Sequence, residues 1–263
     1  MRELTSIDQV TDACGDDDLI MWAAQGMKPG IRAWAHRDAV AVASPHASRR
    51  HRLAVAGRPE HAVPLVRHAL AEVGRRFRPF GDAELIDAVA HAIPELDKPH
   101  RFSWMTLREL TPPEPGRGPG DRSDGVEPPA WLRPEDDPQV DLLLKEASPE
   151  SYAVPGIPGV RRWAGIRSTT GELLAVAADA WSAPTVGLLA GVATAVPARG
   201  RGLGERICRF VVEELLATYG RASLMVDDWN AAAIRVYERI GFARRPVAAA
   251  RFPQPGGHDL FDD

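Results

Sequence analysis

The chain has 263 residues, of which 44% are hydrophobic and 26% are charged, and its formal net charge is −4. This composition is typical of a globular protein large enough for two cores, and the slight negative charge excludes a general attraction to nucleic acid. Because the N-terminal residues are charged and no apolar run is long enough to span a bilayer, we expect a cytoplasmic protein without a signal peptide or membrane segment.

The first 110 residues predict a small α/β unit. Short apolar runs predict strands, and stripes of apolar residues at helical spacing predict two helices between the third and fourth strands. The strands are expected at residues 31–36, 39–44, 51–57 and 101–110, and the helices at residues 59–77 and 82–96. No glycine-rich turn joins a strand to a helix in this half.

Residues 111–130 differ in composition from the segments on either side, because six of these residues are proline and four are glycine. Such a segment has little backbone that can join a helix or sheet, and few apolar side chains to offset the entropy lost on ordering. The composition predicts a linker between a domain at residues 1–110 and a second domain at residues 131–263. The alternative is a long surface loop within one domain.

The second half predicts a mixed sheet. Acidic residues at its start and Lys145 near its end indicate a helix at residues 134–148, and Gly171 marks the turn of a hairpin. A nearly continuous apolar run at residues 185–196 is typical of a strand buried on both faces. The hairpin strands are expected at residues 160–168 and 173–181, further helices at 202–220 and 230–241, and further strands at 222–228 and 247–252. This order predicts an α/β fold with a mixed sheet.

The stretch VPARGRGLGERIC, residues 196–208, lies between the buried strand and an amphipathic helix. A helix N-terminus carries unpaired N–H groups and the positive end of a dipole, both of which attract phosphates. Gly200, Gly202 and Gly204 let a ligand approach the backbone, and two neighbouring arginines add positive charge. The stretch therefore predicts a phosphate-binding turn.

The spacing of this turn excludes the two best-known nucleotide loops. A P-loop requires lysine and then serine or threonine after its last glycine, but Glu205 follows Gly204 here. A dinucleotide fingerprint requires G-x-G-x-x-G in the first strand–helix unit, whereas this chain has G-x-G-x-G late in its sequence.

The segment Arg199-Gly200-Arg201-Gly202-Leu203-Gly204 resembles R-x-x-G-x-G, the pyrophosphate-binding signature of the GNAT superfamily of acyl-CoA N-acyltransferases. The segment MVDDWNAAAIRVYERIGF, residues 225–242, resembles the next motif of that superfamily, in which a strand leads to an asparagine, a helix with a tyrosine, and Gly-Phe. The two motifs stand in the right order, and the resemblance covers residues 131–252. It implies a GNAT fold in the second domain.

The resemblance also implies a role for each matching residue. Backbone groups at the end of the central strand would bind the pantetheine arm of acetyl-CoA, and the amides of the glycine turn would hold its pyrophosphate. Asn230 would lie near the pantetheine or the reacting centre, and Tyr237 near the thioester sulfur. The residues expected to bind the donor are Thr194, Ala195, Val196, Arg199, Gly200, Arg201, Gly202, Leu203, Gly204, Asn230 and Tyr237, the last two of which are also expected to be catalytic.

The implied reaction is direct attack of a neutral primary amine on the thioester in a ternary complex. Backbone N–H groups would stabilise the oxyanion, and the Tyr237 hydroxyl would protonate the departing thiolate. The general base is poorly marked: Asp179, Asp227 and Asp228 are candidates, and a water chain to solvent is an alternative. Cys208 has no partner base and is expected to be a core residue. Neither the cysteines nor the histidines have metal-ligand spacing, so no metal is expected.

The first 110 residues lack both motifs and resemble a degenerate GNAT-like unit, as in glycine N-acyltransferase-like proteins. Such a unit would wall off the acceptor pocket. We expect acetyl-CoA as the donor, a small-molecule or peptide amine as the acceptor, no nucleic-acid or membrane partner, and a monomer or homodimer. Two alternatives stay open: an inactive acyl-CoA-binding regulatory or scaffold protein, because the central strand carries no acid, and a nucleotide-binding protein that uses the same turn.

Overall fold

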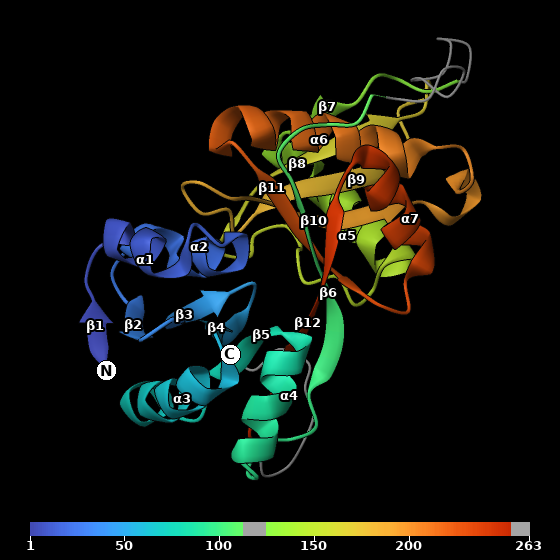
Figure 1. Cartoon of the computed structure of the whole chain (residues 1–263). Helices are drawn as coiled ribbons and strands as arrows, with labels where there is room; N and C mark the ends of the chain where they lie inside the picture. Colours follow the sequence, from blue (N-terminus) through green and yellow to red (C-terminus); the bar gives the residue numbers. More distant parts are fainter. Residues whose placement is uncertain (113–124, 254–263) are drawn as a thin grey trace.

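The computed structural model describes residues 1–112 and 125–253. Within these residues twelve strands form one mixed sheet, which is covered by seven α-helices (Figure 1). The strands are β1 (Arg2–Leu4), β2 (Arg32–His36), β3 (Ala39–Ala47), β4 (Arg50–Ala56), β5 (Arg78–Asp82), β6 (His100–Leu107), β7 (Ala130–Trp131), β8 (Val160–Arg167), β9 (Leu173–Ala180), β10 (Gly187–Thr194), β11 (Ala222–Asp227) and β12 (Ala243–Ala249). The helices are α1 (Ile7–Cys14), α2 (Asp18–Ala24), α3 (Pro59–Val73), α4 (Ala83–Ala92), α5 (Asp137–Ala147), α6 (Leu203–Tyr219) and α7 (Ala231–Ile240), with short 3₁₀ turns at Gln25–Met27, Pro134–Asp136 and Val196–Ala198. The predicted mixed α/β fold class is confirmed.

The two halves of the chain repeat one order of elements. Three antiparallel strands precede a helix, a strand parallel to the third, a second helix and a last strand, first as β2-β3-β4-α3-β5-α4-β6 and then as β8-β9-β10-α6-β11-α7-β12. The last strands are exchanged, because β6 pairs with β11 and β12 while β12 pairs with β5 and β6. Each half therefore completes the sheet of the other, and β6 and β12 run between the halves in Figure 1.

The predicted division of the chain at residues 111–130 stays a prediction. Residues 113–124, which make up most of the predicted linker, lie outside the described residues. The end of the segment belongs to the sheet, because Val126 bridges Ser168 and β7 pairs with β8. The strand order itself has no interruption between the halves.

One hydrophobic cluster is shared by both halves. Trp22 of α2 is fully buried and packs against Trp104 of β6, with ring centroids 5.4 Å apart. Its indole Nε1 donates to the backbone oxygen of Trp181, which follows β9, at 2.9 Å. Two further clusters lie under the helices of one half each, and both include residues of an exchanged strand. The cluster under α3 and α4 contains Ala248 of β12, and the cluster under α6 and α7 contains Met105 of β6. The shared cluster ties the N-terminal helices to the second half.

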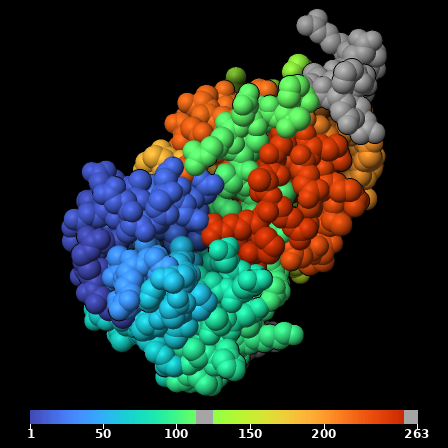
Figure 2. All heavy atoms as spheres, viewed as in Figure 1, coloured from blue at the N-terminus to red at the C-terminus, as the bar shows by residue number. Residues whose placement is uncertain are grey.

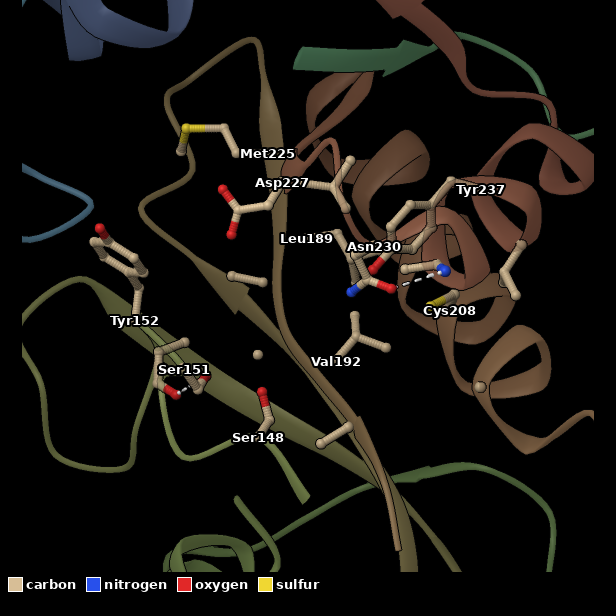
Figure 3. Close-up of a pocket in the computed structure, with 18 of the residues that line it drawn as sticks. Ser148, Ser151, Tyr152, Leu189, Val192, Cys208, Met225, Asp227, Asn230 and Tyr237 are labelled. Atoms are coloured by element: carbon tan, nitrogen blue, oxygen red, sulfur yellow. Dashed lines mark hydrogen bonds between the residues drawn. The ribbon is translucent and has the colours of Figure 1, made fainter. Parts of the chain in front are cut away.

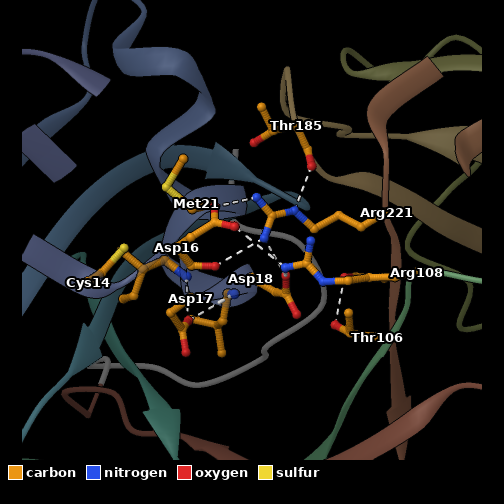
Figure 4. Close-up of polar contacts among 12 residues, drawn as sticks. Cys14, Asp16, Asp17, Asp18, Met21, Thr106, Arg108, Thr185 and Arg221 are labelled. Carbon is orange, nitrogen blue, oxygen red and sulfur yellow. Dashed lines mark hydrogen bonds and ion pairs between the residues drawn. The ribbon is translucent and has the colours of Figure 1, made fainter. Parts of the chain in front are cut away.

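An ionic contact crosses the same boundary. Arg221, at the start of β11, has a side chain that is only 5% exposed and donates to Asp16 at 2.5 Å, Asp18 at 2.6 Å and the backbone oxygen of Thr185 at 2.8 Å (Figure 4). Hydrogen bonds from Arg221 lower the pKa of Asp16. In Figure 2 the red C-terminal residues fill the junction between the blue N-terminal atoms and the orange second half.

The structure also contains elements that the sequence patterns do not predict, among them α1, α2 and β5. β5 is short and contains Pro79 and Gly81, residues uncommon in central strands, and it forms by parallel pairing with β4. β12 begins at Ala243 rather than at residue 247. Its early polar residues belong to the strand because Arg245 pairs with carboxylates of the first half, Asp17 at 2.6 Å among them.

We expect Arg221→Met to destabilise the protein by about 2 kcal/mol, because the change leaves partly buried carboxylates and the Thr185 carbonyl without their charged donor. Urea unfolding followed by tryptophan fluorescence measures the loss. Arg108→Met is the matched control, since Arg108 contacts the same two acids but its side chain is 59% exposed. An exposed pair contributes less than about 1 kcal/mol. Equal losses in the two variants would contradict this assignment.

The stability contributed by Arg221 also depends on pH. Since the pKa of Asp16 is lowered in the folded state from its usual 3.8, the contribution is complete above about pH 4 and is lost as the pH falls through the lowered value. The difference between the wild type and Arg221→Met in urea midpoint should therefore be constant from pH 5 to 7 and shrink below pH 4.

Candidate functional site

The site begins where two parallel strands separate. β10 and β11 pair only at Gly187 with Ala222 and at Leu188 with Ser223, although both strands continue for several residues beyond these pairs. Past the last pair, β10 stays in register with β9 on its other side. The edge of β10 that faces β11 therefore has backbone groups available to a ligand.

A bulge in β10 follows the last of these pairs. The register between β10 and β9 shifts between Ala190 and Ala193, and Gly191 within the bulge has φ of +61°. A Cβ atom at Gly191 would lie 2.4 Å from the ring of Trp163, so glycine is required both by the backbone angle and by the close packing.

A cleft of about 2180 Å³ opens from the separated strands. It is lined by the end of β10, the glycine turn and the start of α7, and also by residues of the first half. Figure 3 shows Ser148 and Tyr152 on one side of this cleft and Asn230 and Tyr237 on the other, with Val192 of β10 between them.

The glycine turn leads into α6 with its backbone exposed. Gly200 and Gly202 have φ of +77° and +76°, and no atom lies within 4 Å of the position of a Cβ at either residue. Gly202 is the N-cap of α6 and supplies no side-chain cap. The first-turn N–H groups of a helix have no acceptor within the helix. The turn is therefore an open cradle with N–H donors, which fits an anion such as a pyrophosphate.

Two of the predicted donor-binding residues have other hydrogen-bond partners. The amide of Ala195 donates to the Leu174 backbone oxygen at 2.8 Å, and the amide of Arg199 donates to Val196 at 3.3 Å. The Arg199 guanidinium binds backbone oxygens of Thr194 at 3.3 Å and of Ala147 at 3.0 Å. Arg199 therefore ties the glycine turn to the end of α5. The other predicted residues of β10 and the turn that line the cleft are Thr194, Gly200, Arg201, Gly202, Leu203 and Gly204.

Asn230 and Tyr237 come together at the α7 side of the cleft. The Asn230 side chain caps α7 by accepting from the Ala233 amide at 3.2 Å. Tyr237 is 7% exposed, and its hydroxyl makes no hydrogen bond to any residue within 1–112 or 125–253. Burial raises the pKa of Tyr237, so the hydroxyl keeps its proton at neutral pH. A protonated hydroxyl on the cleft wall can act as an acid.

Cys208 lies beside Tyr237 and is completely buried in the core under α6. Burial raises the pKa of its thiol, so the nucleophilic thiolate is disfavoured. These observations agree with the expected core role of Cys208.

The three acids proposed as bases have different surroundings. Asp179 is enclosed outside the cleft, where it accepts from Ser182 at 2.5 Å and from Tyr219 at 3.1 Å. Burial raises the pKa of Asp228, but hydrogen bonds from Ser103 and Arg244 outweigh it and lower that pKa overall. The N-cap of α7 is Asn230 rather than Asp228.

Asp227 alone of these acids lines the cleft, and it lies 3.3 Å from Nε2 of His100. His100 is the first residue of β6, it lines the cleft as well, and its side chain is 71% exposed. No local sequence pattern marks His100, because it lies 127 residues from its partner. The exchange of β6 into the second half brings the pair together.

The described residues give two further negative findings. Within 1–112 and 125–253, no helix is long and apolar enough to cross a membrane. The same residues contain no group of three or more histidine, cysteine or acidic side chains placed to hold a metal ion.

Comparison with known proteins supports the fold. Residues 164–251 match a family model described as FR47-like protein. Solved structures of similar fold include a GCN5-related N-acetyltransferase from Kribbella flavida, with a TM-score of 0.59, 21% identity, and coverage of 90% of this chain and 95% of that chain. A GCN5-related N-acetyltransferase-like protein from Streptococcus suis has a TM-score of 0.55 and 13% identity, with coverage of 94% of this chain and 98% of that chain. A GCN5-related N-acetyltransferase from Sphaerobacter thermophilus has a TM-score of 0.54 and 15% identity, with coverage of 86% of this chain and 83% of that chain. No curated protein matches the chain.

The family match lies in the second half and includes the glycine turn, Asn230 and Tyr237. The similar structures extend over both halves, although their low identity supports the fold alone. The chain therefore has the fold of the GNAT acetyltransferases, and its second half carries an FR47-like, GNAT-related domain.

Proposed function

We propose that the chain is an acyl-CoA-dependent N-acetyltransferase that transfers the acetyl group of acetyl-CoA to a primary amine. One observation carries this proposal. The cleft at the separated strands β10 and β11 is lined both by the glycine-rich N-terminus of α6, which has no side-chain cap, and by Tyr237 of α7. A long donor with phosphates at one end and a reactive thioester at the other fits this arrangement.

The donor would be held mainly by backbone groups. Amides from Gly200 to Gly204 would bind the pyrophosphate, and the free edge of β10 would pair with the amide groups of the pantetheine arm. Asn230 would act near the thioester through its amide nitrogen, because its oxygen already caps α7. Arg199 would add positive charge while it holds the turn in place.

The reaction follows from the groups in the cleft. The amine nitrogen attacks the thioester carbonyl, a C–N bond forms, and backbone N–H groups of β10 stabilise the oxyanion. His100, oriented by Asp227, accepts the proton that the amine nitrogen loses. When the C–S bond breaks, the Tyr237 hydroxyl protonates the thiolate and then regains a proton from solvent. Direct transfer suits this site, since the buried Cys208 cannot serve as an acyl carrier.

We also propose that residues 1–110 are a degenerate GNAT-like unit. The repeated element order supports this idea. α3 begins at Pro59 after a single glycine, Gly57, whereas three glycines precede or begin α6 in the second half. The acceptor, a small-molecule or peptide amine, would enter between the two units. We place the enzyme in the cytoplasm as a monomer or homodimer.

Release of the coenzyme A thiol, measured with acetyl-CoA and a panel of primary amines, tests the proposed activity. Turnover with at least one amine supports it. Tight binding of acetyl-CoA without turnover on any amine would favour the inactive binding protein, and thermal stabilisation by ATP or NAD but not by coenzyme A would favour the nucleotide-binding alternative.

Gly202→Asp should weaken coenzyme A binding by about tenfold or more without unfolding the protein. Aspartate tolerates the left-handed backbone and caps helices well, but its charge would stand where the pyrophosphate binds. Gly220→Asp is the matched control, because Gly220 has φ of +78° and equally open surroundings at the far end of α6. Isothermal titration measures the affinity of each variant for coenzyme A. Equal affinities in the two variants would argue against pyrophosphate binding at the glycine turn.

Tyr237→Phe should lower kcat roughly 100-fold, as expected for loss of a general acid, and leave the Kd for coenzyme A nearly unchanged. Tyr219→Phe serves as the control, since Tyr219 is bound to Asp179 and lies outside the cleft. A fully active Tyr237→Phe enzyme would remove the hydroxyl from the mechanism.

His100→Gln should lower kcat at neutral pH by 10-fold or more, about the lower limit for loss of a general base. The loss should lessen as pH rises and the amine arrives without its proton. His91→Gln, on the exposed face of α4, should have no effect on the pH–rate profile. Identical profiles for His100→Gln and the wild type would leave proton removal to water.

A further inference from the structure

A buried arginine of the first half lines the cleft. Arg52 in β4 is 7% exposed, and its Nε donates to the backbone oxygen of Ala47 at 3.0 Å. Its guanidinium lies 5.1 Å from the ring centroid of Phe80 and 5.8 Å from that of Trp22, so aromatic faces hold the planar group. Among the residues that the structure describes, no carboxylate pairs with Arg52.

Two further arginines lie near Arg52 and contribute to its electrostatic surroundings. Arg78 is its register partner on β5, Arg50 precedes it by two residues, and both line the cleft. Burial, together with these two charges, lowers the pKa of Arg52 to about 10, so the guanidinium is still charged at neutral pH. A buried guanidinium without a carboxylate partner among the described residues can bind an anion that enters the cleft.

Strand directions place these arginines at the same sheet edge as the reacting groups. β5, β12, β6 and β11 are antiparallel in succession, β4 is parallel to β5, and β10 is parallel to β11. The beginnings of β4, β5 and β6 therefore share an edge with the ends of β10 and β11. This edge holds Arg52, Arg78, His100 and Asp227.

A short series of contacts joins the arginines to the bulge of β10. The guanidinium of Arg50 lies 5.5 Å from the ring centroid of Tyr152. The next residue, Ala153, borders the bulge, since a Cβ at Gly191 would lie 3.2 Å from its methyl group. Figure 3 shows Tyr152 facing the cleft across from Asn230 and Tyr237.

Stacked rings join Arg52 to the proposed base. Phe80, which lies under the guanidinium, stacks on Phe102 with centroids 5.5 Å apart. Phe102 stacks in turn on the ring of His100 at 6.0 Å. The arginine and the base therefore line one cleft and are connected through a stacked pair of phenylalanine rings.

We propose that Arg52, assisted by Arg50 and Arg78, binds an oxyanion group of the acceptor, so that the substrate is an amine that also carries a carboxylate or a phosphate. This inference rests on the proposed function. The guanidinium fork can bind such a group through two parallel N–H donors. With the oxyanion held by the first half, the amine of the same molecule points toward His100 and the thioester. The first half thereby selects the acceptor while the second half binds the donor.

Acceptors that differ only in the anionic group test the proposal. The set is an α-amino acid, its neutral amide, its decarboxylated amine and the corresponding aminoalkyl phosphate. We expect wild-type kcat/KM to be at least about tenfold higher for the carboxylate or the phosphate than for the neutral amines, and the difference between the two anions identifies which one the site takes. Arg52→Met should raise KM for the anionic acceptors about tenfold or more, with unchanged kcat/KM for the neutral amines and unchanged Kd for coenzyme A.

Controls separate recognition from folding. Arg52→Lys should keep part of the preference, because a lysine keeps the charge but not the planar fork. Arg78→Met is a second, less buried change that should weaken the preference if Arg52→Met fails to fold. Arg58→Met is the matched surface control, because Arg58 pairs with Asp38 outside the cleft.

Thermal shifts produced by the same acceptors in the presence of coenzyme A measure binding without turnover. If no amine is acetylated but the anionic compounds still bind in a way that depends on Arg52, the proposed function fails and the oxyanion site stands. Equal kcat/KM and equal binding of charged and neutral acceptors by the wild type would overturn the site. A preference unchanged in both Arg52→Met and Arg78→Met would also overturn it, as would loss of coenzyme A affinity in Arg52→Met.

Discussion

The parallel ladder between β10 and β11 ends after two residue pairs, and the candidate site depends on that early end. The ring of Trp163 packs against Gly191, the bulge turns β10 aside, and the strand edge opens toward the cleft. The first half repeats the element order without this feature, because β4 and β5 stay paired over four residues. A Cβ at Gly81 of β5 would lie 2.3 Å from the Val55 backbone oxygen, so the two strands are closely packed there. Among the described residues, the parallel strands of the second half separate early, whereas those of the first half stay paired.

The exchange of β6 and β12 then determines which residues of the first half line the cleft beside β10 and β11. It brings His100 of the first half to Asp227 of the second and sets the beginnings of β4 and β5 at the same sheet edge. A buried tryptophan cluster and the ion pairs of Arg221 hold the halves in this arrangement. The stability of the junction and the geometry of the cleft therefore have one structural origin, which is a sheet completed by strands from both halves.

Sequence motifs identified residues on the proposed donor side of the cleft more fully than those on the proposed acceptor side. The glycine turn, Asn230 and Tyr237 all lie between residues 199 and 237, and local spacing is enough to identify such motifs. His100 and Arg52 have no local pattern, because their significance comes from partners far away in sequence. The hydrogen bonds of Ala195 and Arg199 could not be predicted from the sequence either, because they depend on how the turn packs against β9 and α5.

The sequence by itself determined the mixed α/β class, the central strand and the glycine turn before α6, because hydrophobic periodicity and glycine backbone freedom are local properties. Only the tertiary structure decided that the last strands exchange, that β10 separates from β11, and that an arginine of β4 enters the cleft. Strand exchange and bulge packing depend on contacts between residues far apart in sequence, such as Trp163 with Gly191. Those contacts form only when the chain is folded, and they place the proposed acceptor side of the cleft against the proposed donor side.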